Sequence, residues 1–507
     1  MRRRHRALAL MAVAGLLVAA CGGDDNGAGG PTTIDTAGGT DTAGGTVPTD
    51  TGTPSTGGDA APDLPPCPLE ALDAASGPVE VVVWHTQTAE PGDTLAALTE
   101  QYNASQDRVR VRLESQGASY TELKRKFQAA LPSGDLPALL VFDDTSTQEM
   151  VDSGVILPGQ SCFDAAGVPL DDFSEVATSY YTVDGAFWPV AANLGGVLLY
   201  YNRDHFKLAG LDPDAPPRTL DEMRAAAEAI KAAGVAETPV VHEMSSWKTE
   251  FWLTGAGASI VDNDNGRGPG TTSAATLASD PQALQLFTWF DDMVDDGLLT
   301  AVPASDGQID QYLALASKNA SMLIETSSAA TSIEVFLGGG DVNVEGLDED
   351  APSPSGLDIA AAAFPGLVPG HATQMGGAAW YLTNTVAPEV QAAAWDFITF
   401  LNSTESQLAL LTGGSYIPFR TSVLDEPEAV EFFAASLSGQ WLEIAARQID
   451  AIDPAFPGPL IGPYDPDVRE AIEKAQDSLL FGGATPQEAL DQAQDEIDKA
   501  FELYNSF

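Results

Sequence analysis

Apolar and polar positions follow two different rhythms in the region after residue 76. Residues 79–84 form a β-branched run, residues 94–105 place apolar side chains three and four positions apart, and residues 109–113 alternate apolar side chains with arginine. A period of two is typical of a strand, and apolar positions three and four apart are typical of a helix. The pattern predicts a strand, a helix and a second strand in that order.

The same order continues along the chain. A helical pattern at 120–131 leads into the apolar run 139–142, which suits a buried parallel strand. Repeated strand-helix-strand units predict an α/β fold. Further strands are expected at 197–202, 321–324 and 377–382, and further helices at 220–233, at 282–296 after an Asp-Pro start signal, and from Pro466 to the end. Within this last stretch, Thr485-Pro486-Gln487-Glu488 has the pattern of a helix start, with Thr485 as the N-cap.

The first twenty residues have the pattern of an export signal. Arginines near the start precede an apolar run from Ala7 to Ala20, which is too short for a comfortable transmembrane helix. Small residues then stand directly before Cys21, which resembles the lipobox of bacterial lipoproteins. Residues 1–20 are therefore expected to be a lipoprotein signal peptide and Cys21 to carry acyl chains, at about 0.8 kcal/mol per buried CH₂. The alternative is an ordinary secreted protein whose signal happens to contain a cysteine.

Residues 21–76 are predicted to be a lipid-anchored, disordered linker. The part up to about Pro66 consists mainly of Gly, Thr, Asp, Ala and Pro, and it repeats Asp-Thr-Ala-Gly-Gly-Thr at 35–40 and 41–46. A random coil of this length averages roughly 35–40 Å between its ends. The roughly 440 residues that follow are too many for one ordinary core, which favours two lobes.

Acidic residues far outnumber basic ones. The chain has 73 Asp and Glu against 23 Lys and Arg, a formal net charge of -50. Such a surface repels phosphate at long range, which argues against nucleic acid as a partner. The acidic runs are interpreted as solvated faces, with a salty habitat as a weaker explanation. The stretch 262–266 comes close to a calcium loop but lacks the closing Glu at the right distance, so no metal site is predicted.

The two cysteines beyond the lipobox form a possible pair. Cys67 and Cys162 would lie in an oxidising compartment if the chain is exported. A disulfide between them would attach the start of the folded body to the first lobe.

Several motifs in a fixed order resemble those of a known family. Residues 199–220 read LYYNRDHFKLAGLDPDAPPRTL, with Trp84-His85 before them and GGAAW (376–380), GSYIP (414–418) and TPQEAL (485–490) after them. The chain is similar to the family 1 extracellular solute-binding proteins of ABC importers, and within them to the glycerol-3-phosphate-binding subgroup. The resemblance implies a type II periplasmic-binding-protein fold, in which two α/β lobes enclose a ligand cleft. It places one lobe at 77–190 and about 320–376, the other at about 195–319 and 377–507, and the first crossing near 190–195.

The resemblance also implies a set of ligand contacts. They fall on Tyr120, Asp144, Gly195, Thr326, Ser327, Gly377, Tyr416 and Arg469. Arg469 can hold phosphate oxygens with two parallel hydrogen bonds, or it can pair with Glu473 on a helix surface. Asp144 can accept from vicinal hydroxyls or pair with a cation, or it can cap a helix at 145–152.

The remaining contacts have two interpretations as well. Hydroxyls at Thr326 and Ser327 and the N–H of Gly377 would complete a phosphate cradle, or they are ordinary turn residues. Tyr120, Tyr416 and Trp247 would form aromatic walls of the site, or they belong to the core.

Two departures from the family pattern bear on the ligand. Leu220 replaces a tryptophan and Gly195 replaces a serine of the relatives, so a roomier pocket is expected. A glycerophosphodiester such as glycerophosphocholine then becomes attractive beside glycerol 3-phosphate, because Asp144 with nearby tyrosines can hold a quaternary ammonium.

Other functions remain as alternatives. A sugar or oligosaccharide is the second ligand class, since the wider family binds many of these. A secreted hydrolase is the alternative from another class, but the chain has no Gly-x-Ser-x-Gly, His-Glu-x-x-His or P-loop motif, so it is not expected to be an enzyme or to use a cofactor. The expected protein is a monomer on the outer face of the cell membrane that passes its solute to permease subunits.

Overall fold

The computed structural model describes residues 63–304, 310–337, 356–369 and 373–506, all within the compact unit 60–507. The expected signal peptide and the lipidation site Cys21 lie outside the described residues. Within them, no helix is long and apolar enough to cross a membrane.

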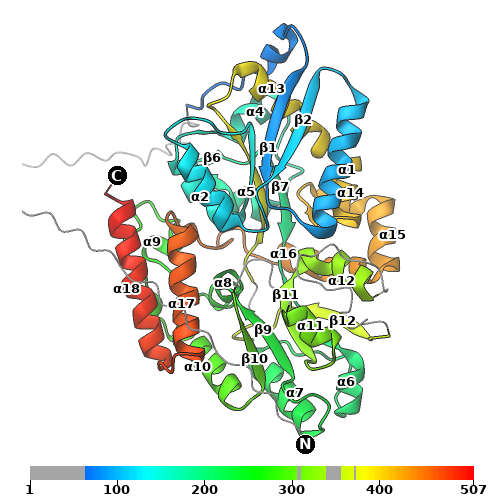
Figure 1. The fold of residues 1–507 in the computed structure, drawn as a ribbon, viewed down its shortest axis with the longest axis vertical. Helices are drawn as coiled ribbons and strands as arrows, with labels where there is room; N and C mark the ends of the chain where they lie inside the picture. Colours follow the sequence, from blue (N-terminus) through cyan, green and yellow to red (C-terminus); the bar gives the residue numbers. More distant parts are fainter. Residues whose placement is uncertain (1–62, 305–309, 338–355, 370–372, 507) are drawn as a thin grey trace, which may run out of the picture. The chain divides into compact units, whose positions relative to one another are not determined.

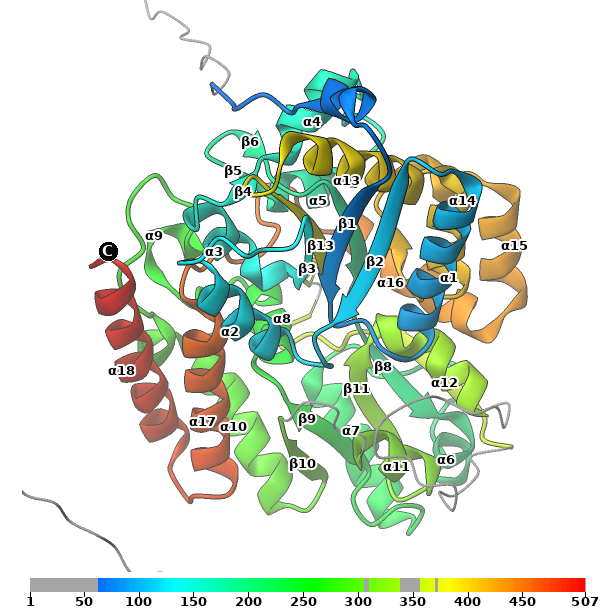
Figure 2. The ribbon, with the colours of Figure 1, turned by 45° about the horizontal axis from the view of Figure 1, so that its top comes forward.

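The first sheet has seven strands and contains the β-α-β units expected near the start of the body (Figure 1). Its strands are β1 (Val79–His85), β2 (Val109–Ser115), β3 (Leu139–Asp143), β4 (Ile156–Leu157), β7 (Ala191–Gly195), β13 (Gly376–Thr383) and β14 (Ile417–Pro418). The order is β14-β7-β13-β3-β1-β2, and β4 pairs with the end of β13. β1 is parallel to β2 and β3, whereas β13 is antiparallel to β3 and β7. Figure 2 shows β1, β2, β3 and β13 side by side.

The second sheet has five strands in the order β10-β9-β11-β8-β12. They are β8 (Val197–Asn202), β9 (Val240–Met244), β10 (Leu299–Pro303), β11 (Met322–Thr326) and β12 (Ile359–Ala363). β8 is buried on both faces: Leu198 and Tyr200 join one hydrophobic core, and Val197, Leu199 and Tyr201 join the other. Because side chains of a strand alternate between its faces, this fully apolar run belongs in the middle of the molecule.

Helices cover both sheets. Those in the chain segments of the first sheet are α1 (Ala89–Ser105), α2 (Tyr120–Ala130), α3 (Thr147–Asp152), α4 (Gly159–Ala166), α5 (Glu175–Tyr180), α13 (Pro388–Leu401), α14 (Thr404–Thr412), α15 (Pro427–Ala435) and α16 (Leu437–Asp450). Those in the segments of the second sheet are α6 (Arg203–Leu208), α7 (Leu220–Ala232), α8 (Ser246–Gly255), α9 (Asp262–Asn265), α10 (Pro281–Asp295), α11 (Asp310–Ala316) and α12 (Ala330–Leu337). Two short helical turns, η2 (Asp144–Ser146) and η6 (Tyr464–Val468), precede α3 and α17.

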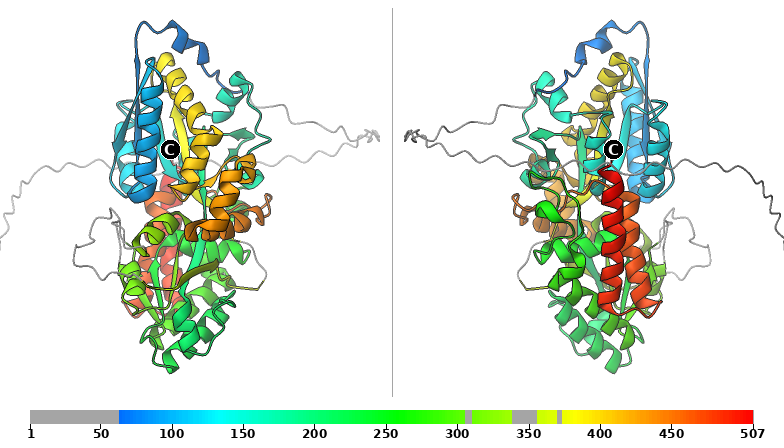
Figure 3. Two further views of the ribbon diagram at one scale, coloured as in Figure 1. Left: turned by 90° about the vertical axis from the view of Figure 1, so that its right-hand side faces the viewer. Right: turned by 90° about the vertical axis from the view of Figure 1, so that its left-hand side faces the viewer.

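The chain ends in a helical pair. α17 (Arg469–Leu480) and α18 (Pro486–Tyr504) pack on each other and on α10, beside the second sheet (Figure 3). The expected helix start at Thr485 is confirmed, because its side chain and that of Glu488 form a reciprocal capping box. The Asp280-Pro281 start of α10 is confirmed in the same way, since the Asp280 carboxylate accepts from the N–H groups of Gln282 and Ala283.

The lobes are composed differently from the expectation. The first crossing follows β7 at Gly196, close to the expected 190–195. However, β11 and β12, from the stretch 320–376, pair with β8 in the second sheet, and β13 pairs with β3 and β7 in the first. The assignment of 320–376 to the first lobe and of all of 377–507 to the second was therefore wrong. A strand pairs with strands that are far away in the sequence, and a short apolar run does not indicate which strand it will pair with.

The folded body begins earlier than residue 77. A short helix at Leu69–Ala74 packs on α13 and buries Leu72, so the expected linker end at residue 76 was wrong. Cys67 and Cys162 form a disulfide with Cα atoms 4.9 Å apart. The bond attaches the start of the body to α4, beside the first sheet.

Candidate functional site

The end of strand β3 contributes a buried carboxylate that contacts both parts of the fold. Oδ1 of Asp144 accepts from the backbone N–H of Gly377 at 3.1 Å and from the indole Nε1–H of Trp247 at 3.3 Å. Gly377 lies on β13 of the first sheet, and Trp247 lies on α8 beside the second sheet. Oδ2 lies 3.4 Å from the hydroxyl of Tyr180. Asp144 is thus a ligand-site candidate between the two sheets, at the strand end where open α/β sheets bind ligands.

The environment of Asp144 disfavours its charge. The side chain is fully buried, and burial, with the nearby charges of Asp143 and Glu250, holds the pKa of this carboxyl well above its usual range. The capping alternative for Asp144 does not apply, because α3 is preceded by Ser146 and has no side-chain cap. A cationic ligand group would restore the charged form.

Arg469 lies at the first position of α17 and is held by two carboxylates. Its Nη2 donates to Oδ2 of Asp143 at 2.7 Å, and its Nε lies 3.1 Å from Oδ2 of Asp465. The guanidinium also stands over the ring of Tyr464, with 5.3 Å between its carbon and the ring centroid. The alternative partner Glu473 instead accepts from the backbone and hydroxyl of Ser246, each at 3.3 Å. Arg469 therefore lies between the sheets and does not form the predicted helix-surface pair with Glu473.

A further carboxyl group lies near this cluster. Glu250 on α8 is fully buried, and Nε2 of Gln374 donates to its Oε2 at 3.2 Å. Burial raises the pKa of Glu250 to about 7, although Tyr464, Gln374 and the charge of Arg469 favour its ionised form. The carboxyls of Asp143 and Asp465 thus pair with one guanidinium, whose charge also acts on Glu250, and none of these three carboxyls was anticipated from the sequence.

The two predicted tyrosines are joined by a glutamine. Nε2 of Gln87 donates to the hydroxyl of Tyr120 at 2.9 Å, and the hydroxyl of Tyr416 donates to Oε1 of Gln87. Burial raises the pKa of Tyr120, and the neighbouring Tyr416 and Asp143 add to this effect. Gln87 was missed in the sequence, although its place just after β1, at the same sheet edge as Asp144, was a usable signal.

The glycines and hydroxyls of the crossing form a contiguous set, but they do not form the predicted cradle. Oγ of Ser327 accepts from the N–H of Gly196 at 3.0 Å, and a Cβ on Gly195 would lie 3.4 Å from that oxygen. Oγ1 of Thr326 accepts from Ser328 N at 3.2 Å, which is turn chemistry. The N–H of Gly377 already donates a hydrogen bond to Asp144. Gly377 therefore positions Asp144, and the other groups bond to one another beside it.

Leu220 does not lie in the site. It begins α7, is 1% exposed in the core of the second sheet, and its carbonyl accepts from the indole of Trp289 at 3.2 Å. The expectation that Leu220 widens the ligand pocket was wrong, because an apolar residue at the start of an amphipathic helix faces the core.

The stretch 262–266 is a folded loop that uses its own polar groups. The carboxylate of Asp262 accepts from the N–H and hydroxyl of Ser273, both at 2.8 Å, and the amide of Asn263 bonds to Gly268 and Gly270. In the part of the chain that the structure describes, no three His, Cys, Asp or Glu residues are arranged to hold a metal ion.

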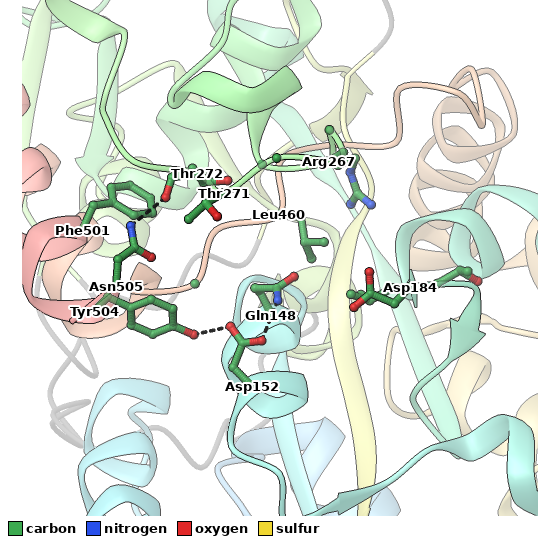
Figure 4. A pocket seen from close by; sticks show the side chains of 16 residues that line it. Gln148, Asp152, Asp184, Arg267, Thr271, Thr272, Leu460, Phe501, Tyr504 and Asn505 are labelled. Carbon is green, nitrogen blue, oxygen red and sulfur yellow. Dashed lines mark hydrogen bonds between the residues drawn. The ribbon is translucent and has the colours of Figure 1, made fainter. Parts of the chain in front are cut away.

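A separate cavity of about 290 Å³ is lined in part by Leu460 and Gly462 (Figure 4). Its walls include Asp152 of α3 and Tyr504 of α18, whose hydroxyl donates to that carboxylate at 2.5 Å. Arg267 also lines it, but its Nη1 donates to the carbonyl of Tyr180 at 3.2 Å and its guanidinium stands 4.7 Å over that ring. The cavity shares no lining residue with the cluster around Asp144, so it is not the candidate site.

The fold and the site identify a class of protein. Residues 97–434, more than half of the chain, match the family model of bacterial extracellular solute-binding proteins, and the chain belongs to this family. Its class is the solute-binding component of ABC importers, whose two α/β lobes enclose the ligand.

Curated relatives resemble the chain over nearly their whole length. The chain is 26% identical over 427 residues to the sn-glycerol-3-phosphate-binding periplasmic protein UgpB of Rhizobium meliloti (strain 1021), which covers 83% of this chain and 93% of that protein. It is 23% identical over 451 residues to the protein of the same name from Escherichia coli O6:K15:H31 (strain 536 / UPEC), covering 87% and 95%.

Solved structures share the fold at low identity. UgpB from Mycobacterium tuberculosis in complex with glycerophosphocholine has a TM-score of 0.66 and 18% identity, covering 85% of this chain and 100% of that one. The GacH receptor of Streptomyces glaucescens GLA.O, known unliganded and with acarbose, has a TM-score of 0.66 and 20% identity, covering 84% and 99%. The two-lobe fold is thus shared by proteins that bind different solutes.

Proposed function

We propose that this chain captures a glycerophosphodiester of the glycerophosphocholine kind, or glycerol 3-phosphate, and delivers it to the permease subunits of an ABC importer. The proposal rests on one observation: a guanidinium lies close to carboxyl groups and aromatic rings. Arg469 stands beside Asp143, and the next residue, Asp144, contacts Trp247 and Tyr180. A solute with both an anionic and a cationic group fits this pairing.

The charges of the site favour a phosphodiester over a phosphomonoester. Planar guanidinium donors suit phosphate oxygens, and a carboxylate beside aromatic rings suits a quaternary ammonium. Phosphate oxygens would have to share Arg469 with Asp143 and Asp465. A singly charged diester does so with less repulsion than a doubly charged monoester. The proposal no longer draws support from Leu220, because that residue is in the core.

The relatives support the same ligand class. The curated proteins that match most of this chain are named for sn-glycerol 3-phosphate, and one similar structure holds glycerophosphocholine. The residue types at Tyr120, Asp144, Gly377, Tyr416 and Arg469 gather in one region between the sheets, as ligand contacts must.

A sugar or oligosaccharide is the second candidate. The GacH receptor and a maltose-bound protein named T. maritima MalE3 share the fold, with TM-scores of 0.66 and 0.65. Carboxylates and an indole such as those of Asp144 and Trp247 also suit sugar hydroxyls and sugar faces. A neutral sugar does not need Arg469, which favours the phosphate-bearing ligand.

We further propose that the protein is a monomeric lipoprotein held at the outer face of the cell membrane. The residues that would carry the anchor, Cys21 and the linker after it, have the sequence pattern described above. Metabolic labelling with a clickable fatty acid, with Cys21→Ser as the control, tests this anchor.

Isothermal titration tests the ligand class. The chain from residue 21, with Cys21→Ser to keep it soluble, is titrated with glycerophosphocholine, glycerol 3-phosphate and maltose in one phosphate-free buffer at matched salt. Micromolar binding of glycerophosphocholine, about -8 kcal/mol, with weaker glycerol 3-phosphate is the expected result. Binding of maltose alone would replace the ligand class by sugars and keep the importer role.

A further inference from the structure

Glu250 faces the same space as the residues that define the candidate site. It lies three positions after Trp247 on α8, so both side chains leave the helix on one face. Trp247 reaches Asp144 across the site, and Glu250 reaches Gln374, which directly precedes β13. Glu250 is therefore a carboxyl group of the second lobe that lies at the candidate site, as Asp144 does from the first lobe.

The hydrogen bonding of the Glu250 carboxyl group is incomplete. The residue is fully buried, and the hydroxyl of Tyr464 lies near its carboxyl group. Even so, its Oε1 forms no hydrogen bond of normal geometry with any residue that the structure describes, and the same holds for Oε1 of Gln374. Leaving a buried polar atom unpaired costs about 1–3 kcal/mol, and more for a charged group. Two unpaired acceptors on side chains that contact each other, at a candidate ligand site, indicate that a donor or a cation from a ligand completes them.

Titratable groups surround Glu250. Those that interact with it are Asp143 and Asp144 at the end of β3, Tyr180 on α5, Tyr464 on η6 and Arg469 on α17, and Asp465 and Glu473 lie beside Arg469. Arg469 is the cation of this group, and Asp143 and Asp465 already hold it as ion pairs. One guanidinium cannot compensate all of these carboxylates, so the least compensated ones keep a proton.

We propose that solute capture at this site releases a proton, because a cationic group of the solute takes the place of the proton on Glu250. The inference rests on the proposed function, since it requires a solute that carries a cation, such as the choline group of a glycerophosphodiester. In the empty site the carboxyl is largely protonated below neutral pH, as burial raises its pKa to about 7. A cation beside it favours the carboxylate, and the proton leaves to solvent.

The direction of the pH effect follows from this exchange. The cation lowers the pKa of Glu250 in the complex below its value in the empty protein, so the complex binds fewer protons than the free state. Affinity therefore rises with pH up to about the pKa of the empty protein, near 7, and levels off above it. An anionic ligand without a cation, such as glycerol 3-phosphate, would show the opposite trend.

Titration calorimetry in two buffers measures the released proton directly. Glycerophosphocholine is titrated into the Cys21→Ser chain at pH 6.5 in PIPES and in ACES, which differ in ionisation enthalpy, and affinities are compared at pH 5.5 and 7.5. We expect release of about half a proton or more at pH 6.5, and affinity about three- to tenfold higher at pH 7.5 than at pH 5.5. Glu250→Gln should lower the release and weaken the pH dependence, with Asp144 left as the other buried carboxyl that can release a proton, whereas Glu431→Gln, on the exposed face of α15, should change neither.

The outcomes separate this inference from the proposed function. Tight binding of glycerophosphocholine with no proton release, or with undiminished release in Glu250→Gln, would overturn the proton exchange and leave the ligand class intact. Absence of glycerophosphocholine binding at every pH would overturn the ligand class and, with it, the exchange. Proton uptake on binding would show that the phosphate, and not the cation, lies next to Glu250, which also overturns the exchange.

Discussion

The indole N–H of Trp247 donates to the carboxylate of Asp144 at 3.3 Å, and this bond joins a helix of the second lobe to a strand end of the first. Both groups need a hydrogen-bond partner because they are buried. A buried carboxylate without a partner is costly, and a buried indole N–H needs an acceptor. A solute that enters between the lobes therefore meets a hydrogen bond that is already formed, and it can bind to the same carboxylate and indole.

Replacing Asp144 by Asn should separate cation recognition from phosphate recognition. The amide keeps an acceptor for Trp247 and Gly377 but removes the charge available to an ammonium group. Affinity for glycerophosphocholine should fall about thirtyfold, or ~2 kcal/mol, while glycerol 3-phosphate should be affected much less. Titration calorimetry with both ligands measures the difference, and equal losses would argue against an ammonium contact at Asp144.

Arg469→Ala should abolish phosphodiester binding and also weaken the fold. The substitution leaves the carboxylates of Asp143 and Asp465 buried without their cation, which costs about 3–5 kcal/mol. Arg125→Ala is the matched control, because Arg125 pairs with Glu470 across the same two lobes but its side chain is 49% exposed. Urea unfolding and calorimetry should show large effects for Arg469 and small ones for Arg125. Unchanged ligand affinity in folded Arg469→Ala would contradict the phosphate site.

Removing the disulfide should lower stability without changing the ligand affinity. The bond between Cys67 and Cys162 closes a loop with a sequence separation of 95, far from the carboxyl cluster, and loss of such a bond costs about 2–5 kcal/mol. Thermal unfolding of Cys67→Ser should match that of the wild-type chain after reduction. A fall in affinity beyond twofold in the folded variant would show that the bridge also positions the site.

Gly377→Ala should disrupt the first sheet beside Asp144. Gly377 has φ of +139°, and a Cβ there would lie 2.0 Å from the carbonyl oxygen of Asn193, so a destabilisation of about 3 kcal/mol or more is expected. Gly117→Ala is the control, since Gly117 also has positive φ, +98°, but has open space around it, and should cost only about 1–2 kcal/mol. Similar melting temperatures for the two variants would contradict the close approach of β13 and β7.

Local pattern in the sequence was enough to predict most of the elements. The β-branched run at 79–84, the alternation at 109–113 and the apolar run at 139–142 are strands β1, β2 and β3, and the capping pattern at Thr485 begins α18. These features depend on neighbours within a few residues, so periodicity and capping chemistry are sufficient to find them.

Tertiary structure decided the lobes and the chemistry of the site. β11 and β13 are both apolar runs in the sequence, yet β11 pairs with β8 and β13 pairs with β3. The side chain of Leu220 lies in a hydrophobic core and not in the cleft. By itself the sequence determined the α/β class and the family motifs, and it predicted a ligand role for Arg469. It did not reveal that Glu250, Asp143 and Asp465 share that arginine, because the burial and charge of each carboxyl arise from segments separated by hundreds of residues and brought together only by folding.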